Sequence, residues 1–478
     1  MDLFQTKPLE RILLESEGQN ALRRSLGPGA LVALGVGAVI GAGIFTLTGV
    51  AAATNSGPGL VFSFVLAAIG CSLAGLCYSE FATMIPVAGS AYTYAYASFG
   101  ELWAWIIGWD LILEYAVGAS TVAIGWSQTL VALLASLGVP FPASVAASPF
   151  QGAAGGLINL PAVAIVAIVS LILIAGIRES ATVNSVIVAL KVTVILVFIA
   201  IGWNYMLPAN HTPLIPPNQG QFGHFGWSGI LAGAGVMFFA YIGFDAVSTA
   251  AQEAKNPRRD LPLGIFGSLA VCTLLFILYS WVLTGVVDYR QLNVAAPLAL
   301  ALARIPYHWL NVAMNLAVLA GLTSVMLVML MGQSRVFYSM ARDGLLPQAF
   351  AEVHPKFRTP WRSNLLLMVF VSLFSAFAPI EVVGKMTSIG TMFAFVIVCG
   401  GVIVLRRRRP EAARPFRTPW APVVPVLGIV MNLALMLGLG VSNWARLVGW
   451  LAIGLGIYFG RRRQRSTVVA CGSTEATP

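Results

Sequence analysis

The chain has 478 residues, of which 58% are hydrophobic and only 10% are charged, and its mean hydropathy is +0.84. An ordinary soluble domain carries about 25% charged residues, so a water-soluble globular fold is excluded. The net charge of +10 fits either a nucleic-acid surface or the anionic face of a membrane, and the positions of the basic residues must decide. The five cysteines and four histidines show no metal-binding spacing, so we expect no metal and no cofactor.

Hydropathy divides the chain into stretches long enough to cross a bilayer, because a transmembrane helix needs ~20 predominantly apolar residues. Twelve such spans predict an all-α polytopic membrane protein. The spans cover residues 29–53, 60–84, 102–137, 160–177, 184–207, 229–250, 263–287, 309–340, 363–380, 381–405, 421–441 and 444–460.

The segments between and around the spans are too short for a soluble domain. Residues 1–28 form a polar cytoplasmic segment, and residues 461–478 form a cytoplasmic tail. Spans 1 to 5 lie within residues 29–207, spans 6 to 10 within 229–405, and the last two spans within 419–460.

Basic residues set the predicted orientation, since Lys and Arg are retained on the cytoplasmic side of a membrane. With the N-terminus inside, 23 of the 28 Lys and Arg residues lie on the cytoplasmic side, four lie outside, and Lys191 lies within a span. Both termini are then cytoplasmic in a plasma membrane, here the bacterial inner membrane. The basic run 406–409 is a topology signal, so we expect a lipid environment and no nucleic-acid partner.

The spans carry no nucleophile with its base, no metal cluster and no G-x-S-x-G, H-E-x-x-H or P-loop motif, so we expect no enzyme. No repeated filter loop of a channel is found either. A carrier is the class that remains.

Glycines interrupt span 1 near its middle, in the sequence GVGAVIGAGIF of residues 35–45. These glycines either allow a neighbouring helix to pack closely, or they mark a point where the helix unwinds beside a cavity. Span 6 has a similar segment, GAGVMFFAYIGFD at residues 233–245. The two spans lie five apart, and an odd offset reverses direction through the membrane, so the pattern predicts a 5+5 inverted repeat with broken spans 1 and 6.

Two broken helices at the bilayer midplane suit a zwitterionic substrate. The free N–H groups at the start of a half-helix favour a carboxylate, and the free carbonyls at a half-helix end favour an ammonium group. An α-amino acid carries both groups at a fixed separation.

At these residues the chain resembles the amino acid, polyamine and organocation superfamily, and within it a bacterial member of the cationic amino acid transporter family. The resemblance covers the chain from residue 22 to about residue 460. It rests on GAVIGAGIF at 37–45, PVAGSAY at 86–92, GELWAWIIGWDLILEY at 100–115, FAYIGFD at 239–245 and MARDGLLP at 340–347.

The resemblance implies the leucine-transporter fold and transport by alternating access. It also implies a substrate site in which backbone amides of span 1 hold the carboxylate and carbonyls of span 6 take the ammonium group, with Asp245 beside them. The implied residues are Ile40, Gly41, Ala42 and Gly43 in span 1, and Phe239, Ala240 and Ile242 in span 6.

Four ionisable residues lie inside spans, and each costs ~2.5 to 3.5 kcal/mol on insertion scales unless it is paired or hydrated. Asp110 and Glu114 share one face of span 3. Asp110 is expected to make a packing contact, whereas Glu114 either packs or handles a proton. Asp245 either caps the second half of span 6 or shapes the site directly.

Lys191 lies in the cytoplasmic half of span 5. In sodium-coupled members of the implied fold, a cation bridges spans 1, 5 and 8 on that side, and the Lys191 ammonium would replace this ion. It would either titrate during each cycle or remain a static tether. Sodium dependence should then be absent.

Other side chains are expected near the site. The tryptophans Trp103, Trp105 and Trp109 begin a span, where they favour an interfacial belt. The possible pocket lining is Tyr115, Phe244, Thr323, Ser324 and Met326.

These features together predict a secondary active amino acid transporter that imports cationic or small neutral L-amino acids with protons. The alternatives are a cation-independent exchanger or facilitator, and an amino acid sensor that does not transport. The expected partners are the substrate, protons and membrane lipid, and the sequence does not indicate a partner subunit.

Overall fold

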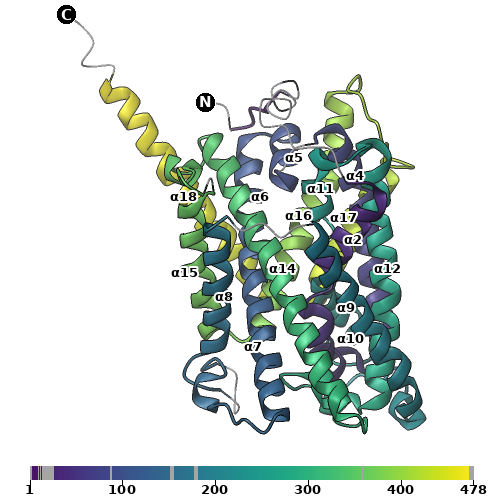
Figure 1. Cartoon of the computed structure of the whole chain (residues 1–478). Coiled ribbons are helices and arrows are strands. Elements are labelled where there is room, and N and C mark those ends of the chain that lie inside the picture. Colours follow the sequence, from purple (N-terminus) through teal and green to yellow (C-terminus); the bar gives the residue numbers. More distant parts are fainter. Residues whose placement is uncertain are drawn as a thin grey trace, which may run out of the picture.

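The computed structural model describes residues 3–8, 10, 12, 26–86, 89–150, 155–176, 181–357 and 359–472. Long helices run side by side, and residues 3–8 lie at the same end of the bundle as the C-terminal part of the last helix (Figure 1). No β-strand is assigned within these ranges, where two isolated bridges are the only β pairings. The predicted all-α polytopic fold is confirmed.

Each predicted span coincides with a helical segment. The first five contain α2 (Pro28–Val39), α3 (Thr48–Ala51), α4 (Leu60–Met84), α6 (Glu101–Ile112), α7 (Gly118–Ser136), α8 (Leu160–Ile174) and α9 (Ala181–Gly202). The next five contain α10 (Gly226–Met237), α11 (Ala246–Thr249), α12 (Pro257–Val286), α14 (His308–Arg342), α15 (Trp361–Phe377) and α16 (Ile380–Arg408). The chain continues into α17 (Val423–Gly438) and α18 (Val441–Gly472), while α5 (Ser90–Ser98) and α13 (Pro297–Leu302) are short connecting helices.

The number of membrane crossings stays a prediction. Within the described residues, seven helical segments are long and apolar enough to span a membrane, and the pair α17 and α18, bent by 113°, would add an eighth. One of the seven, Gly43–Met84, joins the second half of span 1 to span 2. The helices α2, α8 and α15 are apolar but shorter; α2, with 12 residues, rises only ~18 Å and needs the segment after its break to cross the membrane.

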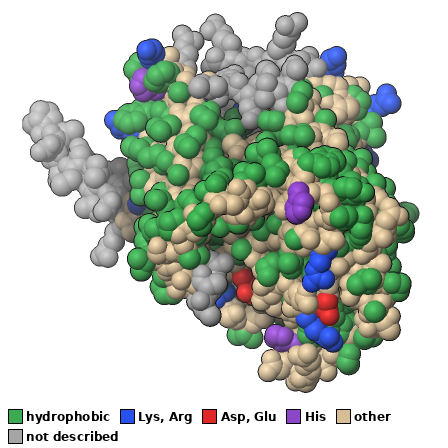
Figure 2. All heavy atoms as spheres, turned by 60° about the horizontal axis from the view of Figure 1, so that its bottom comes forward, with side chains coloured by type: hydrophobic (Ala, Val, Ile, Leu, Met, Phe, Trp, Pro, Cys, Tyr) green, Lys and Arg blue, Asp and Glu red, His purple; other side chains and the backbone are tan. Residues whose placement is uncertain are grey.

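The outer surface of the bundle is apolar. Large hydrophobic side chains such as Leu171, Val369, Leu373, Val430 and Leu437 are each more than half exposed. Figure 2 shows hydrophobic side chains spread over the visible surface, with only a few charged groups among them. A surface of this kind is stable in contact with lipid and unstable in contact with water.

Two of the tryptophans expected in an interfacial belt instead join α6 to α18. Trp105 is buried, and its Nε1–H donates to the Gly454 carbonyl (2.8 Å). Trp109 stacks on Trp450 with 4.8 Å between ring centroids, and its Nε1–H donates to the Trp450 carbonyl (2.8 Å). The belt prediction is wrong for these two residues, because α18 covers the face of α6 that carries them.

A buried carboxylate ties α4 to α16 and to the segment before α17. Arg406 forms a two-pronged ion pair with Glu80 (2.6 and 2.9 Å), and Arg414 Nε lies 3.4 Å from the same carboxylate. The Thr418 backbone N–H also donates to Glu80 (2.8 Å). Arg406, the first residue of the basic run 406–409, therefore has a specific structural partner.

Replacing Glu80 by Ala should destabilise the fold, because it removes the carboxylate that balances the charges of Arg406 and Arg414 and leaves these guanidinium groups with backbone carbonyl acceptors alone. Removing one partner of a fully buried pair costs roughly 3 to 5 kcal/mol, and the partial exposure of Arg406 reduces our expectation to roughly 2 to 4 kcal/mol. Equilibrium unfolding in detergent measures the difference. The exposed pair Arg362–Glu352 gives the control: Glu352→Ala should change stability by less than about 1 kcal/mol. Equal effects of the two variants would contradict the expectation.

Candidate functional site

Span 1 is broken where the glycines predict it. Helix α2 ends at Val39, and Ile40 is extended with ψ 98°. The chain resumes as a π-helical turn over Gly43–Leu47, followed by α3. The first N–H groups of a resumed helix have no partner within it, so this turn presents backbone donors at a buried position.

Span 6 is broken at the corresponding place. Helix α10 ends at Met237 and is followed by a 3₁₀ turn over Phe238–Tyr241, after which Ile242 is extended with ψ 132°. Gly243 has a φ of +119°, and a Cβ there would lie 2.9 Å from the Ala38 carbonyl group. Only glycine suits both the backbone angle and this close approach.

The two breaks touch each other. A Cβ placed on Gly43 would lie 2.4 Å from the Ala240 Cα, so the backbones of the two interrupted helices are in direct contact. The structure thus brings together the predicted residues of both spans, and all of them are buried. The Phe239 carbonyl already accepts from the Ile242 N–H (3.2 Å), which leaves it one further lone pair.

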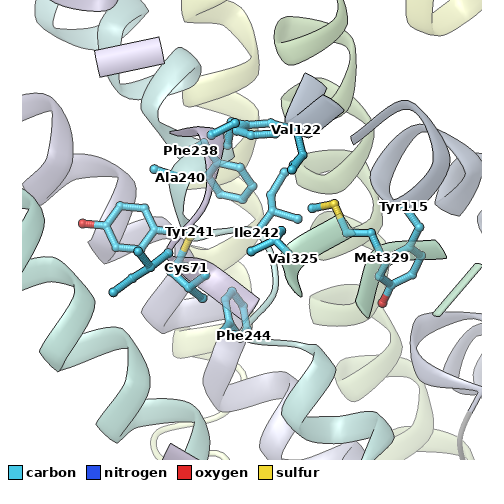
Figure 3. Close-up of a cluster of buried hydrophobic side chains, with 14 of the residues drawn as sticks. Cys71, Tyr115, Val122, Phe238, Ala240, Tyr241, Ile242, Phe244, Val325 and Met329 are labelled. Atoms are coloured by element: carbon cyan, nitrogen blue, oxygen red, sulfur yellow. The ribbon is translucent and has the colours of Figure 1, made fainter. Parts of the chain in front are cut away.

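An aliphatic surface lies beside the breaks. Val325 of α14 approaches Gly41, with its methyl groups 3.4 Å from a Cβ placed there. Figure 3 shows Val122, Ile242, Val325 and Met329 gathered on this side of span 6, and all four are buried. A side chain bound between them would meet apolar atoms.

A carboxyl cluster lies on another side of the span 6 break. The Tyr115 hydroxyl donates to Asp245, and Glu114 lies close to Asp245 and to Thr391 of α16. Asp245 occupies the residue before α11, but its side chain makes no cap hydrogen bond there. The Asp245 carboxyl group lies near the Ala246 backbone N–H at the start of α11, so the capping alternative stays a prediction; the side chain also joins span 6 to span 3.

Lys191 lies where the resemblance implies. Its Nζ donates to the Gly37 carbonyl at the end of α2 (2.7 Å), and its side chain is 1% exposed. The methylene groups lie against Gly321 of α14, where a Cβ would be 2.9 Å from Lys191 Cε. One side chain of α9 therefore contacts spans 1 and 8 together.

The remaining predicted residues lie in different surroundings. Phe244 packs edge to face on Tyr78 and lies against Phe395 (centroids 6.0 and 5.2 Å apart). Thr323 accepts from the Trp126 indole N–H (3.1 Å) on α7, and the Ser324 and Met326 side chains are buried.

The sequence analysis missed Val325 and Met329, although both lie in span 8. They are four residues apart and therefore share one helix face, together with Gly332, which packs on Tyr115. Their spacing places them on one face of span 8, but the sequence does not show which face of this helix is turned toward the breaks. Within the described residues, no group of three or more His, Cys, Asp or Glu side chains could hold a metal ion.

Interrupted helices that meet at a buried centre, inside a helical bundle with an apolar outer surface, define a polytopic membrane transporter. Comparison with known proteins specifies the family. The sequence model described as "Amino acid permease" matches residues 26–457. The chain belongs to this family, in the amino acid, polyamine and organocation superfamily, and it is a transporter and not an enzyme.

Three relatives show the range of the family. The chain is 44% identical to the branched-chain amino acid permease BcaP of Bacillus subtilis over 468 residues, 97% of this chain and 98% of that protein. It is 42% identical to the methylthioribose transporter of the same organism over 464 residues, with 97% and 98% coverage. It is 36% identical to the vacuolar cationic amino acid transporter 4 of Arabidopsis thaliana over 419 residues, with 86% and 68% coverage.

The contact between Gly43 and Ala240 predicts that a single methyl group added at Gly43 disrupts the site. Gly43→Ala should push the Ala240 backbone away and abolish amino acid binding, because its Cβ has no space. Gly449→Ala in α18 is the matched control, since nothing lies within 4 Å of a Cβ there. Ligand-induced thermal stabilisation of purified protein measures binding, and the melting temperature without ligand checks the fold. Wild-type affinity in Gly43→Ala would show that the break is only a packing contact.

Proposed function

We propose that the protein imports L-amino acids together with protons across the cell membrane by alternating access. The observation that carries this proposal is the contact between the two helix breaks. Free N–H groups at the start of the turn Gly43–Leu47 would hold the substrate carboxylate, and carbonyls of Phe239, Ala240 and Ile242 would take its ammonium group.

The aliphatic surface favours a neutral substrate over a cationic one. Val122, Ile242, Val325 and Met329 offer no counter-charge to a guanidinium or ammonium side chain. The relative named as a branched-chain amino acid permease agrees with this preference. We therefore propose small and branched aliphatic L-amino acids as the main substrates.

Two buried ionisable residues support proton coupling. Lys191 would supply a fixed positive charge between spans 1, 5 and 8, so that sodium is not needed there. Glu114 would carry the transported proton, because it lies beside Asp245 at the break of span 6. Movement of the span 6 break during transport would then change the surroundings of Glu114.

The proposed orientation places both termini in the cytoplasm. The bundle end that carries residues 3–8 also carries the ion pair of Lys7 with Asp343 (2.8 Å) and the cluster of Glu80, Arg406 and Arg414. This concentration of Lys and Arg supports a cytoplasmic location.

Uptake into proteoliposomes tests the proposed function. An inward proton gradient should drive accumulation of labelled leucine, and unlabelled valine and isoleucine should compete with it better than arginine does. Leucine methyl ester and the corresponding decarboxylated amine should bind roughly tenfold to hundredfold more weakly, because each leaves buried polar groups of the site without a partner.

Three results would overturn parts of this proposal. Uptake that needs internal amino acid and ignores the gradient would indicate an exchanger. Binding without uptake would indicate a sensor. Stronger competition by methylthioribose than by valine would place the substrate closer to that of the second relative.

Lys191→Gln should abolish accumulation driven by the proton gradient and change substrate affinity much less. The amide can still donate to the Gly37 carbonyl, but it carries no charge. Transport assays with and without sodium, together with binding measurements, separate the two effects. A fixed charge predicts that Lys191→Arg, which keeps the charge, transports normally with an unchanged pH profile, whereas a Lys191 that titrates in each cycle predicts a changed profile. A sodium requirement in the parent protein would refute the ion-replacement role.

A further inference from the structure

Asp110 is a buried carboxyl group for which the proposed function has no role. It lies in α6, its residue is 1% exposed, and neither of its oxygens has a hydrogen-bond partner among the described residues. Its Oδ1 lies against the backbone of α16, 3.2 Å from where a Cβ on Gly390 would be. A packing role alone would favour an apolar residue here, because an unpartnered buried carboxyl group is costly.

Asp110 continues a line of carboxyl groups that starts at the span 6 break. Asp245 lies at the break, Glu114 lies beside it, and Asp110 is one helical turn further toward the cytoplasm, ~6 Å along the axis. Thr391 lies beside Glu114, and its neighbour Gly390 contacts Asp110, so α16 lies along this step.

A partly exposed carboxylate, Asp343, lies near the same end of α6, beyond the face opposite Asp110. Gly108, two residues before Asp110 and therefore on the other face of α6, lies against the Met340 thioether and the Tyr92 ring, 2.6 and 3.2 Å from a Cβ placed there. The Tyr92 hydroxyl donates to Asp343 (2.8 Å), whose side chain is 17% exposed. Burial raises the pKa of Tyr92, and the Asp343 carboxylate raises it further, so this hydroxyl stays a donor.

In the described part of the chain, no Lys or Arg side chain hydrogen-bonds to the oxygens of Asp110 or Glu114. Between Lys385 and Arg406, α16 carries no charged residue, and Arg335 and Arg342 of α14 lie toward its cytoplasmic end. Three neighbouring carboxyl groups in such a place cannot all be ionised, so they must share protons. The other titratable groups facing the cluster are Tyr115, Tyr78 and Tyr94.

We propose that Asp110 is a second proton-carrying residue, which receives the transported proton from Glu114 and releases it toward the cytoplasm. In this step the Glu114 carboxylic acid becomes a carboxylate and the Asp110 carboxylate becomes the acid, so charge and protons balance. Asp110 then gives the proton to cytoplasmic water when the end of the bundle around Tyr92 opens. The inference rests on the proposed role of Glu114.

Asp110→Asn tests this role in proteoliposomes. Net uptake driven by the proton gradient should fall about tenfold or more, because the amide cannot carry the proton. Exchange of internal for external leucine involves no net proton movement and should stay within about twofold of the parent rate. Asp260→Asn is the matched control: it removes another buried carboxyl group, in α12, which lies outside the line and accepts from the Asn256 N–H. This control should leave both activities unchanged.

Glu114→Gln separates failure of the relay from failure of the proposed function. If Glu114→Gln loses gradient-driven uptake and Asp110→Asn keeps it, Asp110 is no relay and the proposed coupling stands. If Glu114→Gln keeps full gradient-driven uptake, the proposed coupling itself fails, and the relay fails with it.

Asp110→Glu and infrared spectroscopy keep the inference testable if Asp110→Asn does not fold. The glutamate keeps the carboxyl group but moves it by one methylene, so the pH dependence of net uptake should shift while exchange is retained. The carbonyl stretch of a protonated carboxylic acid should also change when substrate binds to the parent, and this signal should move in Asp110→Glu. An unchanged pH profile and an unchanged infrared signal would overturn the role.

Discussion

The contact between the backbones of the two helix breaks is the constraint on which the rest of the structure depends. Gly43 and Ala240 approach so closely that no side chain fits between them. The chemistry at this point must therefore come from peptide groups, since nothing else is present. The glycine at 43 is the consequence of that geometry, whereas Gly41 faces Val325 of α14 and Ala42 lies close to Gly125 of α7.

Ionisable side chains consequently lie beside the breaks and not within the contact between them. Lys191 approaches from α9 and donates to Gly37, one of the carbonyls that the end of α2 leaves without a helical partner. A cation at the C-terminal end of a helix is also favoured by the helix dipole. The carboxyl groups of Glu114 and Asp245 lie instead between span 3 and the break of span 6.

The sequence predicts the features that depend on residue type. It does not predict those that depend on how each helix is rotated about its own axis. Breaks at residues 40–42 and 242–245 could be predicted because glycine and its neighbours determine the local backbone. The inward-facing residues Val325 and Met329 could not, because the rotation of α14 is set by its contacts with α7 and α9. Trp105 shows the same limit: its position in span 3 is evident, but its burial requires α18.

A π-helical turn in span 3 explains how two consecutive residues reach the same partner. On a regular α-helix, Glu114 and Tyr115 would point about 100° apart. They lie in the turn Leu113–Val117, where the wider winding changes the direction of successive side chains, and both approach Asp245. Such turns are rare and have no strong sequence signal, so the i,i+4 spacing of Asp110 and Glu114 gave only part of the cluster. The regular helix before this turn keeps Asp110 one turn from Glu114. The π-helical turn directs Glu114 toward Asp245 of span 6. The carboxyl groups of Asp110, Glu114 and Asp245 therefore follow one another in a line.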